Sequence, residues 1–416
     1  MSKAKNQNSS LQSVSLSSQE LMEVIETCVA CPMDGYPGQP GCLWGAPLLL
    51  EGEPGIAKTA RIKQIAKGLH TDLFVFYAAP HPPESFAGAL IPDGKGGATS
   101  IVALSELRKA IERGTGIIFL DEINGAAPAT QGALQSLVHE RISGGVSIPG
   151  ELRILAAQNP EEIATGGFRL SPPVANRFMH RADPGPTADE WIKWSTGGTT
   201  WESKYNLDDL ERLIAHSWPD VWPEVQGLFA GFIHRHPDLL HKRPDISHPD
   251  SGKAWPSHRM WDIARRIWTT QRIMGRSETI AEAVIESCVG PGAGGVFMTY
   301  ATKTKIPAPT EILNGQWTID PNRLDIVVAA YSAATAYVVQ RPTIEEKHAV
   351  APKLWKALKG LFDAQMSDIV VPSVEILLQE KLGRNSGNGD IVKAANPVLV
   401  ELNKTGLVAL KEASEK

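Results

Sequence analysis

The stretch LLLEGEPGIAKTARIKQIAKG, residues 48–68, decides the fold of this chain. An apolar run typical of a buried strand enters a loop, and a helical stretch from Thr59 to Lys67 follows, with Gly68 as its expected stop. The small residues of the loop GEPGIAKT, Gly52 to Thr59, allow backbone N–H groups to approach an anion at the start of the helix. The order strand, loop, Lys-Thr and helix therefore predicts a phosphate-binding loop.

Each residue of this loop has an expected place around a nucleotide. Lys58 is expected to neutralise the β and γ phosphates, and Thr59 to ligate Mg²⁺. The other residues that we expect to line the nucleotide are Gly52, Glu53, Pro54, Gly55, Ile56, Ala57 and Ala60. Ala57 stands where the usual pattern has glycine, and its methyl group is tolerable if φ stays negative. The alternative is a chance glycine turn, against which the agreement of strand, loop and helix argues.

Two carboxylates follow a second apolar run. The segment IIFL, residues 117–120, leads directly into Asp121 and Glu122. Because the carboxyl ends of parallel strands face the ligand crevice, we expect Asp121 to hold Mg²⁺, directly or through water. Glu122 is expected to polarise the attacking water. Paired acids at a strand end are commonly only solvated, so the prediction depends on their combination with the phosphate loop.

Two further polar positions fit a nucleotide site. Asn159 follows the apolar run ILAAQ and is expected to orient the water or touch the γ-phosphate, unless it is only an amide in a turn. Ser257 is a predicted N-cap, which places Arg259 in the first turn of a helix. A cation there opposes the helix dipole at a cost of about 0.3–1 kcal/mol, which a bound anion would offset. The alternative for Arg259 is a solvated side chain.

The alternation of apolar strands and helical stretches predicts a doubly wound α/β domain with a parallel sheet. The expected strands are Pro47–Leu50, Leu73–Tyr77, Gly116–Leu120, Leu152–Ala157 and Phe178–Ala182. Helical periodicity dominates after about Thr187, as in the apolar face of Met260, Ile263, Ala264 and Ile267. The expected organisation is a disordered leader (1–20), an α/β nucleotide-binding domain (21–186), a helical lid (187–315) and a helical C-terminal extension (316–416).

The bulk composition is that of a folded protein with two or three domains. The chain has 416 residues, of which 42% are hydrophobic and 21% charged. The formal net charge of −5 argues against broad binding to nucleic acid, which needs a basic surface. No apolar run reaches the ~20 residues of a membrane span, and we expect a cytoplasmic protein without a signal peptide.

Together these motifs resemble the MoxR-like family of AAA+ ATPases, particularly members encoded beside von Willebrand A domain proteins. The resemblance covers roughly residues 21–315, and the sequence GxPGxAKT makes Ala57 a family trait. The stretch after the acidic pair also matches, at Glu122-Ile123-Asn124-Gly125-Ala126-Ala127-Pro128, Gln131, Ala133, Leu134 and Glu140-Arg141.

The resemblance implies roles for particular residues. Gln158-Asn159-Pro160 matches the sensor 1 segment, and Pro256-Ser257-His258-Arg259 resembles sensor 2. Ala175-Asn176-Arg177-Phe178 is similar to the family's DRF segment, with Asn in place of Asp, which makes Arg177 an arginine finger that reaches the neighbouring subunit. From the sequence alone, a lone arginine such as Arg177 is usually a surface charge. The segment His81–Gly97 resembles an insertion that in related ATPases faces a central pore and touches the client.

The function that the resemblance implies is ATP-driven remodelling or activation of a protein partner by a ring of this chain, expected to be a hexamer. The implied partner is a von Willebrand A domain protein with a metal-ion adhesion site. One rival is a nucleic-acid motor, because MCM helicases share the insertion; the acidic charge counts against it. Another rival is an ATP-binding scaffold with little turnover, against which Glu122 and Arg177 argue.

Two other clusters carry weaker signals. Cys28, Cys31 and Cys42 form CxxC plus a third thiol within an expected Gly/Pro-rich loop, but zinc sites usually need four ligands. Five histidines fall between His234 and His258 among acidic residues, in spacings that match no ligand pattern. We expect a solvated loop there, and the sequence leaves metal binding at both clusters open. No chemistry is assigned to residues 316–416.

Overall fold

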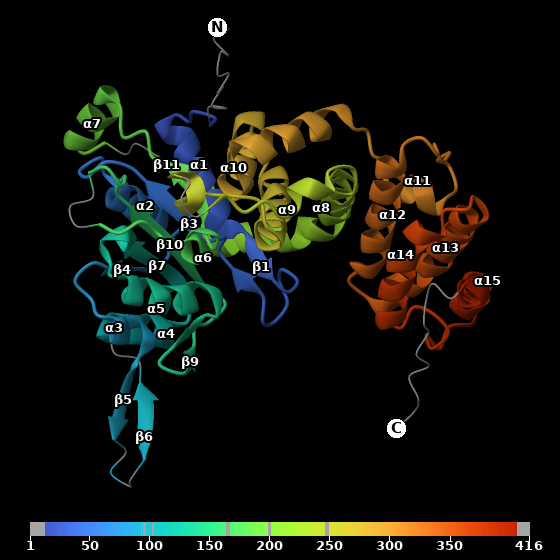
Figure 1. Ribbon diagram of the computed structural model, residues 1–416, viewed down its shortest axis with the longest axis horizontal. Coiled ribbons are helices and arrows are strands. Elements are labelled where there is room, and N and C mark those ends of the chain that lie inside the picture. Colours follow the sequence, from blue (N-terminus) through green and yellow to red (C-terminus); the bar gives the residue numbers. More distant parts are fainter. Residues whose placement is uncertain are drawn as a thin grey trace, which may run out of the picture. The chain divides into compact units, whose positions relative to one another are not determined.

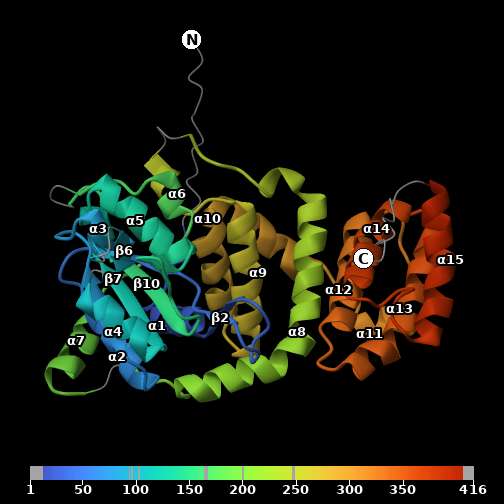
Figure 2. The same cartoon turned by 90° about the horizontal axis from the view of Figure 1, so that it is seen from below.

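The structure is a computed structural model that describes residues 13–405, except 93, 95–96, 102–103, 164–166, 199–200 and 246–248. The chain divides into two compact units, each shown in Figures 1 and 2. Unit one comprises residues 1–215 and 238–298, and unit two comprises residues 216–237 and 299–416. Both units are therefore built from two separate parts of the chain.

A five-stranded parallel sheet forms the centre of unit one, in the order β11-β3-β10-β7-β4. The strands are β3 (Leu48–Glu51), β4 (Leu73–Tyr77), β7 (Gly116–Asp121), β10 (Leu152–Gln158) and β11 (Met179–Ala182). Every residue of β7 and β10 is buried, as expected when helices cover both faces of a sheet. The doubly wound α/β fold predicted from the sequence is therefore confirmed, with the strands within one residue of the expected positions.

Five helices accompany this sheet in the chain order of an α/β domain. They are α2 (Lys58–Gly68), α3 (Pro83–Ala87), α4 (Ser105–Arg113), α5 (Pro128–His139) and α6 (Pro172–Ala175). One apolar core joins the sheet to these helices, for example through Ile118 of β7, Leu107 of α4 and Leu134 of α5. This packing fixes the carboxyl ends of the strands, where the candidate site lies.

The N-terminal helix α1 (Ser18–Ala30) begins inside the segment expected to be a disordered leader. Ser17 and Glu20 form a capping box, in which each side chain accepts from the other residue's backbone N–H, and this starts the helix. Residues 1–12 of the expected leader lie outside the described residues. The leader expectation is thus wrong for residues 18–20.

Three small antiparallel pairs lie outside the main sheet. They are β1 (Pro32–Asp34) with β2 (Leu43–Trp44), β5 (Ala89–Pro92) with β6 (Ala98–Ile101), and β8 (Ile142–Ser143) with β9 (Val146–Ser147). The hairpin β5–β6 projects away from the sheet (Figure 1) and exposes 77% of Leu90 and 42% of Ile91. Strand β5 and the short helix α3 lie within the segment His81–Gly97 that was expected to be an insertion, whereas β6 begins directly after it.

Helices dominate after β11. They are α7 (Ala188–Ser195), α8 (Leu207–Arg235), the short helices η2 (Pro237–Leu239) and η3 (Pro249–Gly252), α9 (His258–Ile273) and α10 (Glu278–Lys303). Ser257 caps α9 and accepts from Met260 N, so the predicted N-cap is confirmed. Met260, Ile263, Ala264 and Ile267 are all buried, as their helical spacing predicted. α10 changes direction at Gly290 (φ 77°), which precedes Pro291.

Unit two has a helical core of its own. Its later helices are α11 (Pro309–Leu313), α12 (Leu324–Val339), α13 (Ile344–Asp363), α14 (Ser367–Gln379) and α15 (Gly389–Thr405). Trp355 is fully buried there, and its indole N–H donates to Leu382 O at 2.7 Å. In both units, no helix within the described residues is long and apolar enough to cross a membrane.

Candidate functional site

The phosphate loop connects β3 to α2 and uses two left-handed backbone positions. Gly55 has φ 84°, which glycine adopts readily, and Ala57 has φ 77°. The expectation of a negative φ at Ala57 is therefore wrong: the turn that starts α2 requires a left-handed residue directly before Lys58. No side chain caps the first turn of α2, so its backbone N–H groups have no competing side-chain acceptor.

Lys58 links the loop to the neighbouring strand β10. Its ammonium donates to Gly52 O at 2.5 Å, to Glu53 O at 2.9 Å and to Asn159 Oδ1 at 2.9 Å. Burial lowers the pKa of Lys58 below its usual value, although the nearby carboxylates of Asp121 and Asp183 act against this. Lys58 is thus a buried, oriented cation at the edge of the sheet.

Thr59 and Asp121 meet at the same edge. Thr59 Oγ1 donates to Asp121 Oδ2 at 2.6 Å, and Asp121 Oδ1 accepts from Glu122 N at 3.0 Å. A hydroxyl and a carboxylate brought together in this way are hard oxygen ligands that suit Mg²⁺. Glu122 has φ 54°, and its side chain is exposed whereas that of Asp121 is buried.

Asn124 completes this edge and was missed by the sequence reasoning. Its amide N–H donates to Asn159 O at 2.7 Å, and its Oδ1 accepts from Asn159 N at 3.4 Å. These two bonds fix the backbone of Asn159, whose side chain contacts Lys58. The signal in the sequence was an amide two residues after the acidic pair.

A buried ion pair holds helix α2, which begins at the phosphate loop, against the end of strand β11. Arg61 of α2 contacts Asp183 at 3.0 Å, with side-chain exposures of 8% and 0%, and also donates to Ser18 Oγ. Asp183 directly follows β11 and accepts from Gly185 N at 2.8 Å. The sequence reasoning did not single out this pair, because nothing local shows that residues 61 and 183 meet.

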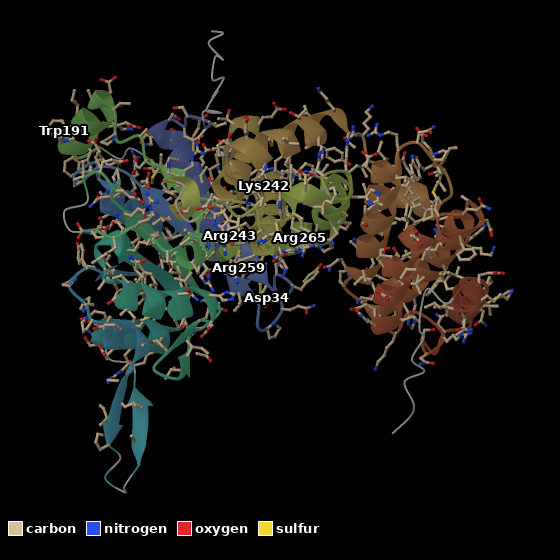
Figure 3. All side chains as sticks on the ribbon, viewed as in Figure 1. Asp34, Trp191, Lys242, Arg243, Arg259 and Arg265 are labelled. Carbon is tan, nitrogen blue, oxygen red and sulfur yellow. The ribbon has the colours of Figure 1, made fainter. Side chains whose placement is uncertain are left out.

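Arg177 and Arg259 lie near each other in unit one (Arg259 is labelled in Figure 3). Arg177 donates to Pro173 O, and Arg259 donates to Asn176 O at 3.5 Å. Arg259 Nη2 also lies 3.2 Å from Nε2 of His139, the last residue of α5. Burial lowers the pKa of both guanidinium groups, and the charge of Arg259 adds to this effect on Arg177.

These two arginines do not belong to the cluster around Lys58. Within the described part of the chain, neither guanidinium makes a salt bridge to a carboxylate. Among the described residues, the hydrogen bonds of both arginines go to Pro173, Asn176 and His139 and to none of the residues around Lys58. The predicted site residues therefore form two groups: one around Lys58, Thr59, Asp121 and Asn159, and one around Arg177 and Arg259.

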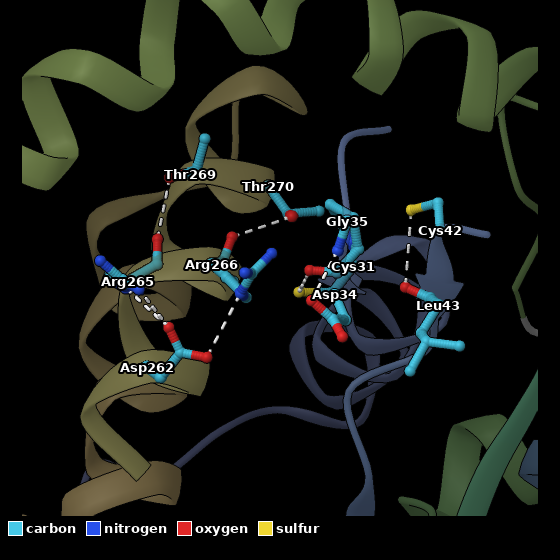
Figure 4. Close-up of polar contacts among 11 residues, drawn as sticks. Cys31, Asp34, Gly35, Cys42, Leu43, Asp262, Arg265, Arg266, Thr269 and Thr270 are labelled. Atoms are coloured by element: carbon cyan, nitrogen blue, oxygen red, sulfur yellow. Dashed lines mark hydrogen bonds and ion pairs between the residues drawn. The ribbon is translucent and has the colours of Figure 1, made fainter. Parts of the chain in front are cut away.

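Of the three clustered cysteines, Cys28 lies outside the expected loop; Cys31 and Cys42 are shown in Figure 4. Cys28 lies in the last turn of α1 and Cys31 is its C-cap, which corrects the loop expectation for Cys28. All four cysteines are free and buried, and burial raises the pKa of Cys31 to about 12 and of Cys42 to about 11. Such thiols are poor nucleophiles and poor ligands.

Metal ligands do not cluster elsewhere in the part of the chain that the structure describes. No group of three or more His, Cys, Asp or Glu residues there is arranged to hold a metal ion. His248, one of the five histidines in the segment 234–258, lies outside the described residues. His241 packs edge-on against Trp255 and close to His258.

The parallel sheet and the cluster of residues around Lys58 define the class of domain to which this part of the chain belongs. A loop that presents Lys-Thr at a helix start, beside an aspartate and an asparagine on neighbouring strand ends, is a phosphate-loop nucleotide site. Residues 47–178 match the family model of the AAA domain (dynein-related subfamily). This part of the chain is therefore an AAA domain, the nucleotide-binding domain of the AAA ATPases.

Two curated proteins are similar to parts of this chain. Midasin from Giardia intestinalis is 31% identical over 152 residues, which are 32% of this chain and 3% of midasin. The uncharacterized protein YeaC from Bacillus subtilis is 28% identical over 177 residues, which are 40% of this chain and 51% of YeaC. The matches thus span about half of one relative and a small part of the other.

A solved structure also aligns with the chain. It is a Cytophaga hutchinsonii protein provisionally described as an ATPase, with 17% identity and a TM-score of 0.43. The alignment covers 68% of this chain and 88% of that one.

Proposed function

We propose that this chain binds Mg·ATP at the loop Gly52–Thr59 and hydrolyses it. The observation that carries the proposal is the hydrogen-bonded meeting of Lys58 with Asn159, and of Thr59 with Asp121, at one edge of the sheet. Four groups from three separate segments of the chain converge there. A phosphate-binding and metal-binding role explains this convergence.

Each residue has a defined task in that reaction. Lys58 and the uncapped N–H groups of α2 bind the β and γ phosphates. Thr59 and Asp121 hold Mg²⁺, which when bound neutralises phosphate charge and orients the leaving group. Glu122, exposed at the strand end, accepts hydrogen bonds from the attacking water, and Asn159 orients that water or the γ-phosphate.

The second group of residues suggests that the site is shared between subunits. Arg177 and Arg259 hold two positive charges together, and neither forms a salt bridge among the described residues although the charge of Glu140 acts on Arg177; this arrangement suits an anion. They are separate from the cluster around Lys58 of their own chain. We therefore assign both to the γ-phosphate bound by a neighbouring subunit in a ring.

The use of the ATP energy is proposed as remodelling or activation of a protein partner. The hairpin β5–β6 offers exposed Leu90 and Ile91 at a distance from the sheet, where a client chain can be contacted. A hexamer and a von Willebrand A domain partner are proposed from the resemblance to the MoxR-like family alone.

A pair of variants tests the nucleotide site. Lys58→Ala removes a charge-assisted contact to the phosphates and should abolish ATP binding in calorimetry. Glu122→Gln keeps the shape of the side chain, and should still bind ATP while turnover falls by ~10²-fold or more. The matched controls are Lys63→Ala on the exposed face of α2 and Glu112→Gln on α4, both expected to behave as the parent.

Either of two results would overturn the proposal. Unchanged ATP affinity in Lys58→Ala would mean that the loop is no phosphate site. Parental hydrolysis by Glu122→Gln would remove Glu122 from the chemistry.

A further inference from the structure

Asn176 connects the segment that carries Arg177 to the start of the helix that carries Arg259. Its amide N–H donates to Trp255 O at 3.1 Å, and its Oδ1 accepts from Ser257 Oγ at 2.7 Å. Ser257 is the N-cap of α9, and Arg259 stands two residues further on. The buried amide of Asn176 therefore ties the α6–β11 turn to the cap of α9.

These two hydrogen bonds require both the N–H group and the oxygen of the Asn176 amide. The Trp255 carbonyl can only accept and thus needs a donor, whereas the Ser257 hydroxyl already donates to Asn176 Oδ1. A carboxylate at position 176 would keep the bond from Ser257 but would face the carbonyl of Trp255 with a negative charge. Asn176 is 5% exposed, so water cannot easily replace the lost bond.

His139, the last residue of α5, also contacts Arg259. Its Nε2 lies 3.2 Å from Arg259 Nη2, and since a guanidinium only donates, the imidazole must be neutral and accept there. The charge of Arg177 also lowers the pKa of His139, so this one neutral ring lies within the influence of two cations. The end of α5 and the start of α9 are held together through this contact.

We propose that Asn176 and His139 are positioning residues that hold Arg259 beside Arg177, so that both guanidinium groups reach one phosphate as a single preformed unit. This inference rests on the proposed function, in which that phosphate is bound by the neighbouring subunit. Preforming the pair matters because two like charges repel and would otherwise separate before the anion arrives. Neither positioning residue touches the nucleotide.

The first test is Asn176→Asp, measured in assembled protein by steady-state ATP turnover. We expect kcat to fall by about 10- to 100-fold, because a small displacement of catalytic groups has effects of that size. KM should stay near the parental value, since the variant's own phosphate loop is intact. Adding Lys58→Ala subunits, whose Arg177 and Arg259 are correctly held, should restore part of the turnover.

A control separates this effect from a general effect of an added carboxylate. Asn388 Oδ1 accepts from Asp390 N and Ile391 N at the start of α15, and Asp accepts equally well there. Asn388→Asp should therefore turn over ATP as the parent does. Parental kcat in Asn176→Asp, or a fall that Lys58→Ala subunits do not rescue, would overturn the role of Asn176.

The second test uses pH, because His139 accepts only when neutral. The pKa of His139 lies below its usual 6.5, through burial and the charges of Arg259 and Arg177, while Glu140 acts in the opposite direction. The contact is thus intact above pH 6.5 and is lost as the pH falls through this lowered pKa. His180, on strand β11, has a pKa of about 4 because it is buried.

Two variants of His139 distinguish the outcomes. His139→Gln retains an acceptor that does not titrate, so kcat should stay parental at pH 7.5 and lose the acid fall that the parent shows below pH 6.5. His139→Ala lacks the acceptor and should be impaired at both pH values. An unchanged acid fall in His139→Gln would overturn the role of His139.

Failure of this inference differs from failure of the proposed function. If Arg177→Ala and Arg259→Ala both hydrolyse ATP at the parental rate, the shared site itself is wrong. If both arginine variants are impaired while Asn176→Asp and His139→Ala are not, only the positioning role is wrong.

Discussion

Ala57 stands at a position of the phosphate loop where the usual pattern has glycine. It adopts a left-handed conformation (φ 77°) directly before Lys58, although its Cβ disfavours that region. The hydrogen bonds of the following residues, Lys58 to Asn159 and Thr59 to Asp121, offset this backbone strain. Strained backbone of this kind is concentrated at ligand-binding positions.

Replacing Ala57 with glycine should therefore remove strain. The left-handed conformation costs a residue with a Cβ about 1–2 kcal/mol. Glycine also makes the unfolded chain more flexible, which opposes the gain by about 0.4–1 kcal/mol. We expect Ala57→Gly to leave the free energy of unfolding unchanged or raise it by up to about 1.5 kcal/mol, measured by denaturant titration.

Ala60 provides the matched control. It lies exposed in the first turn of α2, where the backbone is helical, so Ala60→Gly should destabilise by roughly 0.5–1 kcal/mol. Equal destabilisation by both substitutions would contradict the left-handed conformation of Ala57.

At the scale of elements, the ion pair of Arg61 and Asp183 joins helix α2 to the end of strand β11. Both side chains are almost completely buried, and Gly185 N and Ser18 Oγ occupy further polar positions around them. The helix that begins at the phosphate loop is thus anchored to the edge strand of the sheet. Anchoring this helix keeps Lys58 and Thr59 in place at the other strand ends.

Removal of one partner should leave the other uncompensated. Arg61→Met keeps most of the side-chain volume but leaves the carboxylate of Asp183 buried without its cation. Breaking such a pair typically costs about 3–5 kcal/mol, which we expect as a lower free energy of unfolding in chemical denaturation.

An exposed pair of the same chemistry is the control. Arg113 and Asp72 lie 2.6 Å apart with side-chain exposures of 63% and 50%, and such pairs contribute about 0–1 kcal/mol. Arg113→Met should therefore have little effect. A loss in Arg61→Met no larger than that in Arg113→Met would show that burial does not control the energy of the Arg61 pair.

At the scale of the whole molecule, the proposed function has the site around Lys58 completed by Arg177 and Arg259 of a second copy. A head-to-tail interface places the arginine group of one subunit at the phosphate loop of the next. Arginines supplied in this way increase turnover by ~10³-fold or more. Hydrolysis should therefore depend on assembly.

Mixing two inactive variants tests this arrangement. Arg177→Ala should bind ATP and hydrolyse it poorly, and Lys58→Ala should not bind it. A Lys58→Ala subunit still provides Arg177 to an Arg177→Ala neighbour with an intact loop. Random mixing should thus restore up to about one interface in four, measured as ATP turnover across mixing ratios. No recovery in confirmed mixed assemblies would mean that Arg177 acts within its own subunit or not at all.

The sequence by itself determined the strands, the phosphate loop and the acidic strand end. These depend on neighbours in the chain: β7 is apolar over Gly116–Leu120 because both faces of the sheet are covered, and Lys58 follows a loop of small residues. Local patterns of apolar residues, glycine and caps report such features directly. The same holds for Ser257, whose capping position was predicted from its place before a helical stretch.

Which distant groups meet depends on the packing of the sheet and the helices. Asn176 and Ser257 are 81 residues apart, and Arg61 and Asp183 are 122 apart. Their pairing follows from how the sheet and helices pack, and no local pattern encodes it. The φ of Ala57 also depends on the position of the whole loop. Tertiary packing therefore placed Arg259 beside Arg177 and His139, and it joined Lys58 to Asn159, because the energy of burying each polar group depends on a partner brought from elsewhere in the chain.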